Sequence, residues 1–343
     1  MHIPDNVVIG DSLSVLKEFR SANTFDRTAV LVDENTRAHC LPKSEIGDDV
    51  AIIEIRSGEE NKTLETCTHI WQQMTDLKMS RKSLLINLGG GVIGDMGGFV
   101  ASTYKRGMSF VNVPTTLLAQ VDASIGGKLA IDFNGLKNHI GIFREPNLVI
   151  CDTQYLSTLP DREIRSGFAE IVKHCLIRDK EGWYQLKQEA FDPQKDWSTI
   201  LERSVGLKGS VVKEDPEEQG LRKILNFGHT LGHAIETYFL DTNDRLLHGE
   251  AIAIGMILEG YLSTHVSGLP ESDLQTLTKY LLDTYGKVEI PDLKAFGQLL
   301  IHDKKNAGGK VNYSLLSEIG SCFWDQQVET SLIHEAIAFY RNC

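Results

Sequence analysis

The feature that most constrains the fold is an apolar run that leads directly into a glycine-rich segment. Residues Leu84–Leu88 are largely apolar, and glycines follow at positions 89, 90, 91, 94, 97 and 98. Glycine lets the backbone approach a diphosphate closely, and a following helix offers free N–H groups and the positive end of its dipole. The pattern predicts a Rossmann-like α/β nucleotide site with Gly90 and Gly91 at the ligand. The spacing is not the usual G-x-G-x-x-G, so tight packing of helix on strand is the alternative interpretation.

The pattern of the chain changes near residue 160, which predicts two domains in 343 residues. Before this point, short β-rich runs such as Arg27–Asp33 and Ala51–Arg56 alternate with helical patterns. After it, long helical periodicity dominates, as in Gly167–Ile177 and Glu250–Tyr261. The stretch Thr103–Phe143 reads as loops and short strands. We expect an α/β nucleotide domain over residues 1–160 and an all-α domain that binds metal and substrate over residues 161–343.

Composition excludes several classes of partner. A formal charge of -12 argues against nucleic acid, because a duplex binder usually presents a basic face. The longest apolar stretches are too short to span a bilayer, and the start MHIPDNVV lacks a basic segment followed by an apolar block. The six cysteines form no CxxC pair, so neither a zinc ribbon nor a disulfide framework is expected. We therefore expect a cytoplasmic protein with reduced thiols and no membrane partner.

Polar residues follow two of the expected strands. In LVDENT, Asp33 and Asn35 close a strand, and a carboxylate there accepts from a ribose hydroxyl and repels a 2′-phosphate. This would favour NAD over NADP. In SGEENK, Glu59 and Lys62 come just after the next strand. The alternative interpretations are a turn aspartate and an exposed helix start.

Candidate metal ligands gather in the second half. His229 and His233 are four residues apart and so share one face of a helix, His248 opens the next segment, and Glu170 and His174 lie in an earlier helix. Imidazoles together with one carboxylate are typical of a catalytic zinc-type site with open positions. Surface histidines also produce such spacing, and spacing does not decide which donors bind. Our selection is Glu170, His229 and His248, with His233 left as an acid, a base or a hydrogen-bond partner.

Cations accumulate around the same motifs although the chain is acidic. Such residues hold phosphate and carboxylate groups at separate ends of a small substrate, whereas each lysine alone is more often a solvated surface charge. Those flanked by glycine, in GGK and GLKN, are the strongest candidates. The cations are Arg106, Lys128, Lys137, Lys173, Lys208, Arg222, Lys304 and Lys305, with Asn138 and Asn226 as neutral donors.

The motifs together resemble those of the 3-dehydroquinate synthases. In order they are GGGVIGD, TYKRG, VPTTLLAQVDASIGGK, GLKNHIG, SGFAEIVKH, EEQGLRKILNFGHTLGHAIE, HGEAIAIGM and DKK, and they extend from about Asp33 to Lys305. The resemblance implies a fold similar to that of glycerol and iron-type alcohol dehydrogenases. It also implies a homodimer that uses NAD and zinc or cobalt to convert 3-deoxy-D-arabino-heptulosonate 7-phosphate to 3-dehydroquinate in the shikimate pathway.

The resemblance assigns roles residue by residue. The implied metal ligands are again Glu170, His229 and His248. The implied NAD contacts are Asp33, Asn35, Glu59, Lys62, Gly91, Asp95, Thr115, Thr116, Asp122 and Lys137, beside Gly90 of the glycine turn. The implied catalytic residues are Lys128, Lys173, Lys208, Arg222, Asn226, His233 and Lys305. Further substrate contacts are Arg106, Asn138 and Lys304, without a decision between the two late lysines.

Three other functions compete with this one. A glycerol-type dehydrogenase shares the glycine turn and the helical metal domain but needs no cluster for phosphate and carboxylate. A related cyclase would act on a sugar phosphate without a carboxylate, although the GGK and KRG loops resemble the dehydroquinate pattern. A regulator that binds metal and nucleotide without catalysis is the third.

Overall fold

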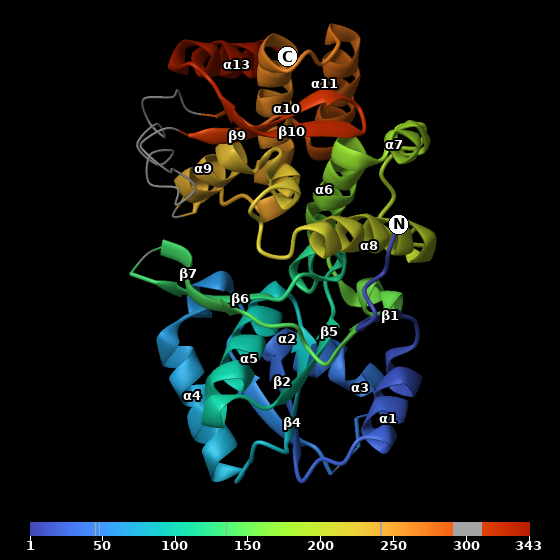
Figure 1. Ribbon diagram of the computed structural model, residues 1–343, viewed down its shortest axis with the longest axis vertical. Helices are drawn as coiled ribbons and strands as arrows, with labels where there is room; N and C mark the ends of the chain where they lie inside the picture. Colours follow the sequence, from blue (N-terminus) through green and yellow to red (C-terminus); the bar gives the residue numbers. More distant parts are fainter. Residues whose placement is uncertain (45, 48, 135, 241, 291–310) are drawn as a thin grey trace. The chain divides into compact units, whose positions relative to one another are not determined.

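The computed structural model describes residues 1–44, 46–47, 49–134, 136–240, 242–290 and 311–343, and the chain divides into two units (Figure 1). The first unit holds Met1–Pro160 and Asp196–Gly209, and the second holds Asp161–Lys195 and Ser210–Cys343. The predicted boundary did not include the return of Asp196–Gly209 to the first unit. This segment packs on the N-terminus, because the His2 N–H donates to the Gly206 carbonyl at 3.0 Å.

The first unit is built on six parallel strands in the order β1-β8-β5-β4-β2-β3. The strands are continuous apolar runs because helices cover both faces of the sheet. After β3 the chain crosses β2 to form β4, which creates a topological switch point between β2 and β4. The strands are β1 (Val7–Ile9), β2 (Thr28–Asp33), β3 (Ala51–Ile55), β4 (Leu84–Gly89), β5 (Ser109–Pro114) and β8 (Leu148–Cys151).

Alternate side chains of each strand enter two separate cores. In β2, Leu31 packs in the core shared with α4 and α5, whereas Val30 and Val32 pack in the core that contains Leu16 of α1. The sheet is therefore the middle layer of three, which confirms the predicted α/β architecture. The helices are α1 (Ser12–Ala22), α2 (Glu34–His39), α3 (Leu41–Ser44), α4 (Leu64–Asp76) and α5 (Gly91–Thr103).

The stretch Thr103–Phe143 contains short strands, as we predicted, but one of them belongs to the main sheet. Its run Ser109–Pro114 is β5, an interior strand of the sheet, because it pairs with β4 on one side and β8 on the other. The antiparallel strands β6 (Lys128–Phe133) and β7 (Leu136–Phe143) then form a hairpin. The glycines and polar residues of this stretch obscured a buried strand only six residues long.

The second unit is mainly helical, as predicted, with α10 packed against α6, α9 and α11. It also contains a hairpin that we did not predict, β9 (Asn312–Glu318) and β10 (Ser321–Gln327). The turn is made at Gly320, where φ is +89°, and buried residues of β9 pack on α10. The helices are α6 (Asp161–Arg178), α7 (Lys180–Leu186), α9 (His229–Phe239), α10 (His248–Val266), α11 (Glu271–Tyr285) and α13 (Thr330–Asn342).

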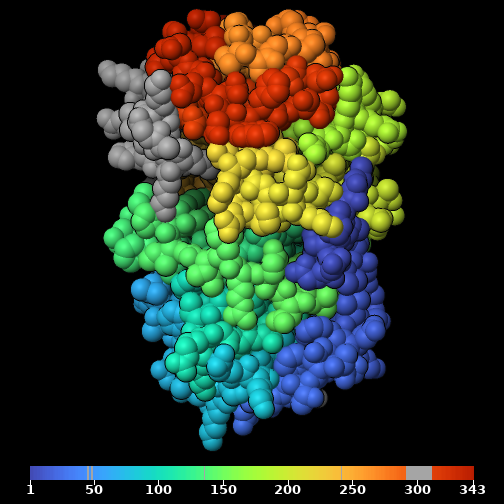
Figure 2. All heavy atoms as spheres, in the orientation of Figure 1, coloured from blue at the N-terminus to red at the C-terminus, as the bar shows by residue number. Residues whose placement is uncertain are grey.

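The hairpin and α13 form the red surface of the second unit in the space-filling view (Figure 2). Helix α8 (Ser198–Glu214) crosses the division between the units after Gly209. None of the helices in the described part of the chain has both the length and the hydropathy needed to cross a bilayer.

Candidate functional site

The predicted nucleotide residues lie at one edge of the first unit's sheet. Parallel strands end on the same side, so Asp33 at the end of β2, Gly89 at the end of β4 and Pro114 at the end of β5 share the carboxyl edge. Asp33 also caps α2, because its Oδ1 accepts from Thr36 N at 2.7 Å. Asn35 lies in the first turn of α2, and not at the end of the strand as we predicted. This edge, beside the switch point, is where α/β sheets bind ligands.

The glycines of the turn serve two different purposes. A Cβ on Gly97 would lie 1.9 Å from Asn87 Oδ1, so this glycine is required for α5 to pack on β4. A Cβ on Gly91 would meet only Ala123 Cβ at 3.4 Å, which is ordinary contact. Packing therefore explains Gly97 but not Gly91. Gly91 begins α5, where N–H groups are free to bind an anion.

Lys62 is the centre of a buried polar cluster in the first unit. Its side chain is 4% exposed, and its Nζ lies 2.6 Å from both Asp95 Oδ2 and Asn138 Oδ1. Burial lowers the pKa of Lys62, but the charges of Asp95 and Glu59 outweigh it and leave the pKa raised. This burial excludes the alternative interpretation of Lys62 as part of an exposed helix start. Asp132 belongs to the same cluster, since it accepts from Asn138 N at 2.7 Å, and no sequence pattern indicated this role.

Two predicted substrate contacts have a left-handed backbone. Arg106 has a φ of +69° and Asn138 a φ of +50°, which are uncommon values for residues other than glycine. Lys105 precedes Arg106 with a φ of +49°. Such conformations cost free energy and concentrate at ligand sites. Arg106 is exposed, as is Lys128, which follows Gly127 and begins β6.

A second ion pair joins two predicted residues that we had assigned to different ligands. Lys208 Nζ lies 2.6 Å from both the carbonyl and Oδ1 of Asp122, and the Lys208 side chain is only 7% exposed. Asp122 sits in a short π-helix, Ala119–Ala123, that directly follows Thr115 and Thr116. Short π-helical turns often occur at functional sites. Lys137, in β7, is half-buried.

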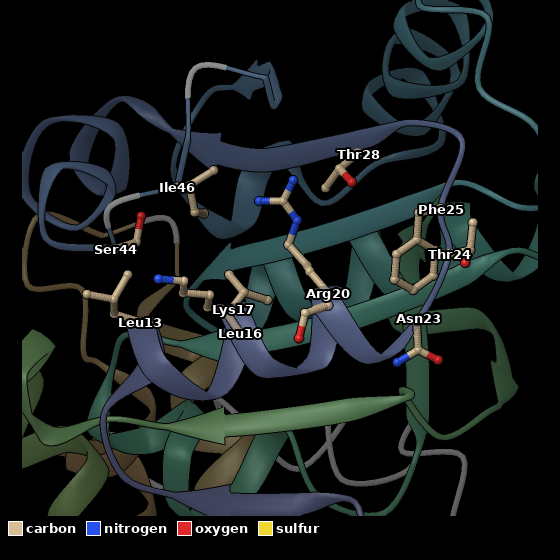
Figure 3. A pocket seen from close by; sticks show the side chains of 11 residues that line it. Leu13, Leu16, Lys17, Arg20, Asn23, Thr24, Phe25, Thr28, Ser44 and Ile46 are labelled. Atoms are coloured by element: carbon tan, nitrogen blue, oxygen red, sulfur yellow. The ribbon is translucent and has the colours of Figure 1, made fainter.

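A pocket of about 470 Å³ lies on the opposite edge of the sheet (Figure 3). Lys17 and Arg20 of α1 line it, together with Phe25, Thr28 and Ser44. Thr28 is the first residue of β2, so the pocket lies at the amino ends of the strands. It is therefore separate from the predicted nucleotide residues.

The second unit brings the three predicted metal ligands together. Glu170 of α6 is fully buried, and its Oε1 lies 3.5 Å from His229 Nε2 and 3.6 Å from His248 Nε2. His233 lies beside them, with its ring centre 5.1 Å from that of His229. Ligand atoms of the three histidines lie within 4.8 Å of one another. Lys173, one turn after Glu170, forms a buried ion pair with Glu170 Oε2.

The two imidazoles that face Glu170 are each held at their other nitrogen. His229 Nδ1 bonds to the Phe227 carbonyl at 3.1 Å, and His248 Nδ1 bonds to Glu236 Oε2 at 3.2 Å. Burial lowers the pKa of His248, but hydrogen bonds to Glu170 and Glu236 raise it to about 10. A metal that binds at His248 Nε2 must displace the proton there, so metal binding depends on pH.

Close helix packing fixes the cluster. A Cβ on Gly255 of α10 would lie 1.9 Å from the Gly228 carbonyl, so glycine lets α10 contact the start of α9. Gly228 has a φ of +78° and is followed at once by His229. Glu259, fully buried on α10, accepts from Gly228 N at 2.6 Å and Leu231 N at 3.0 Å. A carboxylate at this end of α9 also complements the helix dipole.

The predicted anion-binding loop is organised around an aspartate. Asp215 accepts from Gly220 N at 2.7 Å and from Arg222 N at 2.9 Å. Arg222 is buried, and Asn226 Nδ2 donates to Glu218 Oε1 at 2.7 Å. The sequence singled out Arg222 and Asn226 but not the residues that hold them. Lys304 and Lys305 lie outside the described residues.

Sequence reasoning missed Glu236, Glu259, Asp132 and Asp215. Only Glu236 carried a usable signal, because it follows His229 by seven residues and so lies on the same helix face as His229 and His233. The other three act through contacts between segments distant in sequence or through backbone N–H groups. No side-chain spacing encodes such contacts.

Solved structures of two other proteins match almost the whole chain. A 2-deoxy-scyllo-inosose synthase, complexed with carbaglucose-6-phosphate, NAD⁺ and Co²⁺, is 28% identical with a TM-score of 0.86, and 98% of each chain is covered. A 2-epi-5-epi-valiolone synthase from Streptomyces hygroscopicus, with NAD⁺ and Zn²⁺ bound, is 26% identical with a TM-score of 0.87. That match covers 100% of this chain and 98% of the other. With the cluster described above, these matches place the chain in the sugar phosphate cyclase class.

The family within this class follows from sequence comparison. The model of the 3-dehydroquinate synthase N-terminal region matches residues 52–166, and that of the C-terminal region matches residues 167–306. The 3-dehydroquinate synthase of Parabacteroides distasonis is 40% identical over 343 residues, which cover 98% of this chain and 97% of that protein. The chain belongs to the 3-dehydroquinate synthase family.

Proposed function

We propose that the protein converts 3-deoxy-D-arabino-heptulosonate 7-phosphate to 3-dehydroquinate and phosphate. The observation that carries the proposal is the position of Glu170 Oε1, at 3.5 Å from one imidazole nitrogen and 3.6 Å from another, in a chain that matches this family over most of its length. The proposed course is oxidation of a substrate hydroxyl, elimination of phosphate, reduction and aldol ring closure.

The donor set of the second unit fits a divalent metal. Two imidazoles and one carboxylate are the ligands of many catalytic zinc sites, which keep further positions open. Glu170, His229 and His248 would hold zinc or cobalt, and the buried Lys173 would balance the charge of Glu170. His233, beside them, would exchange a proton with the reacting hydroxyl.

The carboxyl edge of the first unit fits NAD. Gly90 and Gly91 would admit the diphosphate to the start of α5, and Asp33 would accept from the ribose. When bound, NAD supplies a hydride acceptor that is regenerated in each turnover, and the metal supplies a Lewis acid for the substrate hydroxyls. The remaining proposed contacts are Asn35, Glu59, Lys62, Asp95, Thr115, Thr116, Asp122 and Lys137.

Charge divides the proposed substrate contacts into two groups. In the first unit, Arg106, Lys128 and Asn138 would bind the phosphate, and two of them have the left-handed backbone noted above. The carboxylate and the reacting oxygens would be held by Lys208, Arg222, Asn226 and one of Lys304 and Lys305. Lys208 is already held close to Asp122, so its ammonium group is positioned before any substrate arrives.

One assay tests the proposed reaction. Purified protein supplied with NAD and Zn²⁺ or Co²⁺ should release inorganic phosphate from the heptulosonate phosphate without net accumulation of NADH. Stoichiometric NADH from glycerol would instead identify a dehydrogenase. Turnover of sedoheptulose 7-phosphate or glucose 6-phosphate, with none of the heptulosonate, would identify a different cyclase.

We also propose that the protein works as a homodimer in the cytoplasm. The resemblance to the family supports the dimer, and sedimentation equilibrium at micromolar concentration tests it. A monomer under conditions of full activity would contradict it.

A further inference from the structure

We infer that Glu236 is a positioning residue that orients His248 for the metal. This inference rests on the metal site of the proposed function but not on the proposed reaction. Glu236 is outside the set of ligands and substrate contacts considered above. It lies on α9, seven residues after His229, and its side chain is 13% exposed.

The two nitrogens of the His248 ring face two different carboxylates. Nε2 lies 3.6 Å from Glu170 Oε1, on the side of the cluster, and Nδ1 lies 3.2 Å from Glu236 Oε2, on the other side. An ionised carboxylate can only accept, so Nδ1 is the donor in this bond. Glu236 therefore holds the proton at Nδ1, so that Nε2 is the nitrogen that the ring can present to a metal.

His229 provides an internal comparison. Its Nε2 also faces Glu170 Oε1, at 3.5 Å, but its Nδ1 is held by the Phe227 carbonyl. A neutral carbonyl fixes the orientation of a ring, whereas a carboxylate also increases the basicity of the ligand nitrogen. Glu236 therefore strengthens the bond of His248 to a metal more than the Phe227 carbonyl strengthens that of His229.

The exposure of His248 explains why it requires such a partner. His229 and His248 are the first residues of α9 and α10, but the His248 side chain is 25% exposed, against 11% for His229. The more exposed side chain is less restrained by packing. The hydrogen bond that Glu236 Oε2 accepts from His248 Nδ1 supplies this restraint from the neighbouring helix α9.

Metal affinity, measured without substrate, tests the inference. Chelator competition should show that Glu236→Ala raises the Kd for Zn²⁺ by about 10- to 100-fold, the usual range for such partners. Glu236→Gln keeps an oxygen that can accept from Nδ1 but loses the charge, so it should raise the Kd less. The control Asp283→Asn removes a carboxylate of the same unit that is 63% exposed and forms an ion pair with Lys279 on α11, and it should leave the Kd unchanged.

A second readout separates positioning from general stability. In the zinc-loaded protein, nitrogen NMR should show His248 protonated at Nδ1, and this proton should exchange faster in Glu236→Gln. Kd values within twofold of the unaltered protein in both variants, with unchanged His248 signals, would overturn the inference. If the unaltered protein binds no metal, both the metal site and the inference fail. Metal binding without phosphate release would reject only the proposed reaction.

Discussion

The carboxyl edge of the first unit and the histidine cluster of the second unit prepare their ligand sites differently. In the cluster, Glu170 Oε1 of α6 lies within 3.6 Å of His229 Nε2 of α9 and of His248 Nε2 of α10. At the sheet edge, the predicted contacts lie on turns, and the cations Lys62 and Lys208 are held by carboxylates of the same unit. The cluster thus presents side-chain ligand atoms, whereas the sheet edge depends on backbone conformation and on ion pairs within the first unit.

The difference shows where substitution should affect binding and where it should affect folding. Replacing a donor of the cluster removes a ligand atom but leaves the helices packed through Gly228, Gly255 and Glu259. Replacing Lys62 or Lys208 leaves a half-buried carboxylate, Asp95 or Asp122, without its cation. We therefore expect loss of activity with an intact fold from the first kind of change, and loss of stability in addition to weaker ligand binding from the second.

The largest effect is expected for His248→Ala. Removing one of three ligand atoms should abolish stoichiometric metal binding and reduce phosphate release by roughly 10³-fold or more, the scale seen when a positioned electrostatic group is lost. NAD affinity, measured by fluorescence quenching, should stay within twofold, because the predicted NAD contacts are in the first unit. A large loss of NAD affinity would show that the two regions are not independent.

The second effect concerns stability. Lys62→Met should lower the free energy of unfolding by about 3 kcal/mol, because Asp95, whose side chain is only 18% exposed, would lose its cation. Urea denaturation followed by circular dichroism measures the change. Arg37→Met is the matched control, since Arg37 is 54% exposed in its pair with Glu54 and should change stability by less than about 1 kcal/mol. Equal losses in the two variants would contradict the special role of the buried pair.

Sequence reasoning predicted the cluster better than the sheet edge for a physical reason. His229 and His233 are separated by one helical turn, and this spacing places both on the same face before any tertiary contact forms. The pairs Lys62–Asp95 and Lys208–Asp122 instead join segments 33 and 86 residues apart. Such pairs depend on the strand order, which the sequence pattern did not determine. The place of β5 inside the main sheet and the β9–β10 hairpin were not predicted, because short strands carry little periodicity.

Two glycine substitutions in α5 separate helix packing from NAD binding. Gly97→Ala should destabilise the protein by about 1–3 kcal/mol, because the new methyl group would overlap Asn87. Gly91→Val should leave stability nearly unchanged and raise the Kd for NAD about tenfold, which corresponds to about 1.4 kcal/mol. Calorimetry of NAD binding and thermal unfolding measure the two effects. If Gly91→Val destabilised the fold without changing the Kd, the glycine turn would be a packing feature only.

The smallest effect is expected for Asp215→Asn. This variant tests whether a loop held by backbone N–H groups positions its side chains as firmly as the packed helices position the histidine cluster. Burial raises the pKa of Asp215, but hydrogen bonds from the N–H groups of Gly220, Arg222 and Gln219 outweigh it, so the pKa is lowered from 3.8. A lowered pKa means that the carboxylate stabilises the loop fully above about pH 4, and that this stabilisation is lost as the pH falls through the lowered value.

The Asp215→Asn variant should therefore lose part of the acid dependence of unfolding below pH 3.8 and raise the KM for the substrate a few-fold at neutral pH, since Arg222 would be less firmly held. Unfolding curves between pH 2 and pH 5, with steady-state kinetics at pH 7.5, measure both. The matched control is Asp196→Asn, whose carboxylate also accepts from a backbone N–H, that of Ser198, but does not contact the Arg222 loop. If the KM were unchanged while the acid dependence of unfolding changed, Asp215 would contribute to stability but not to substrate binding.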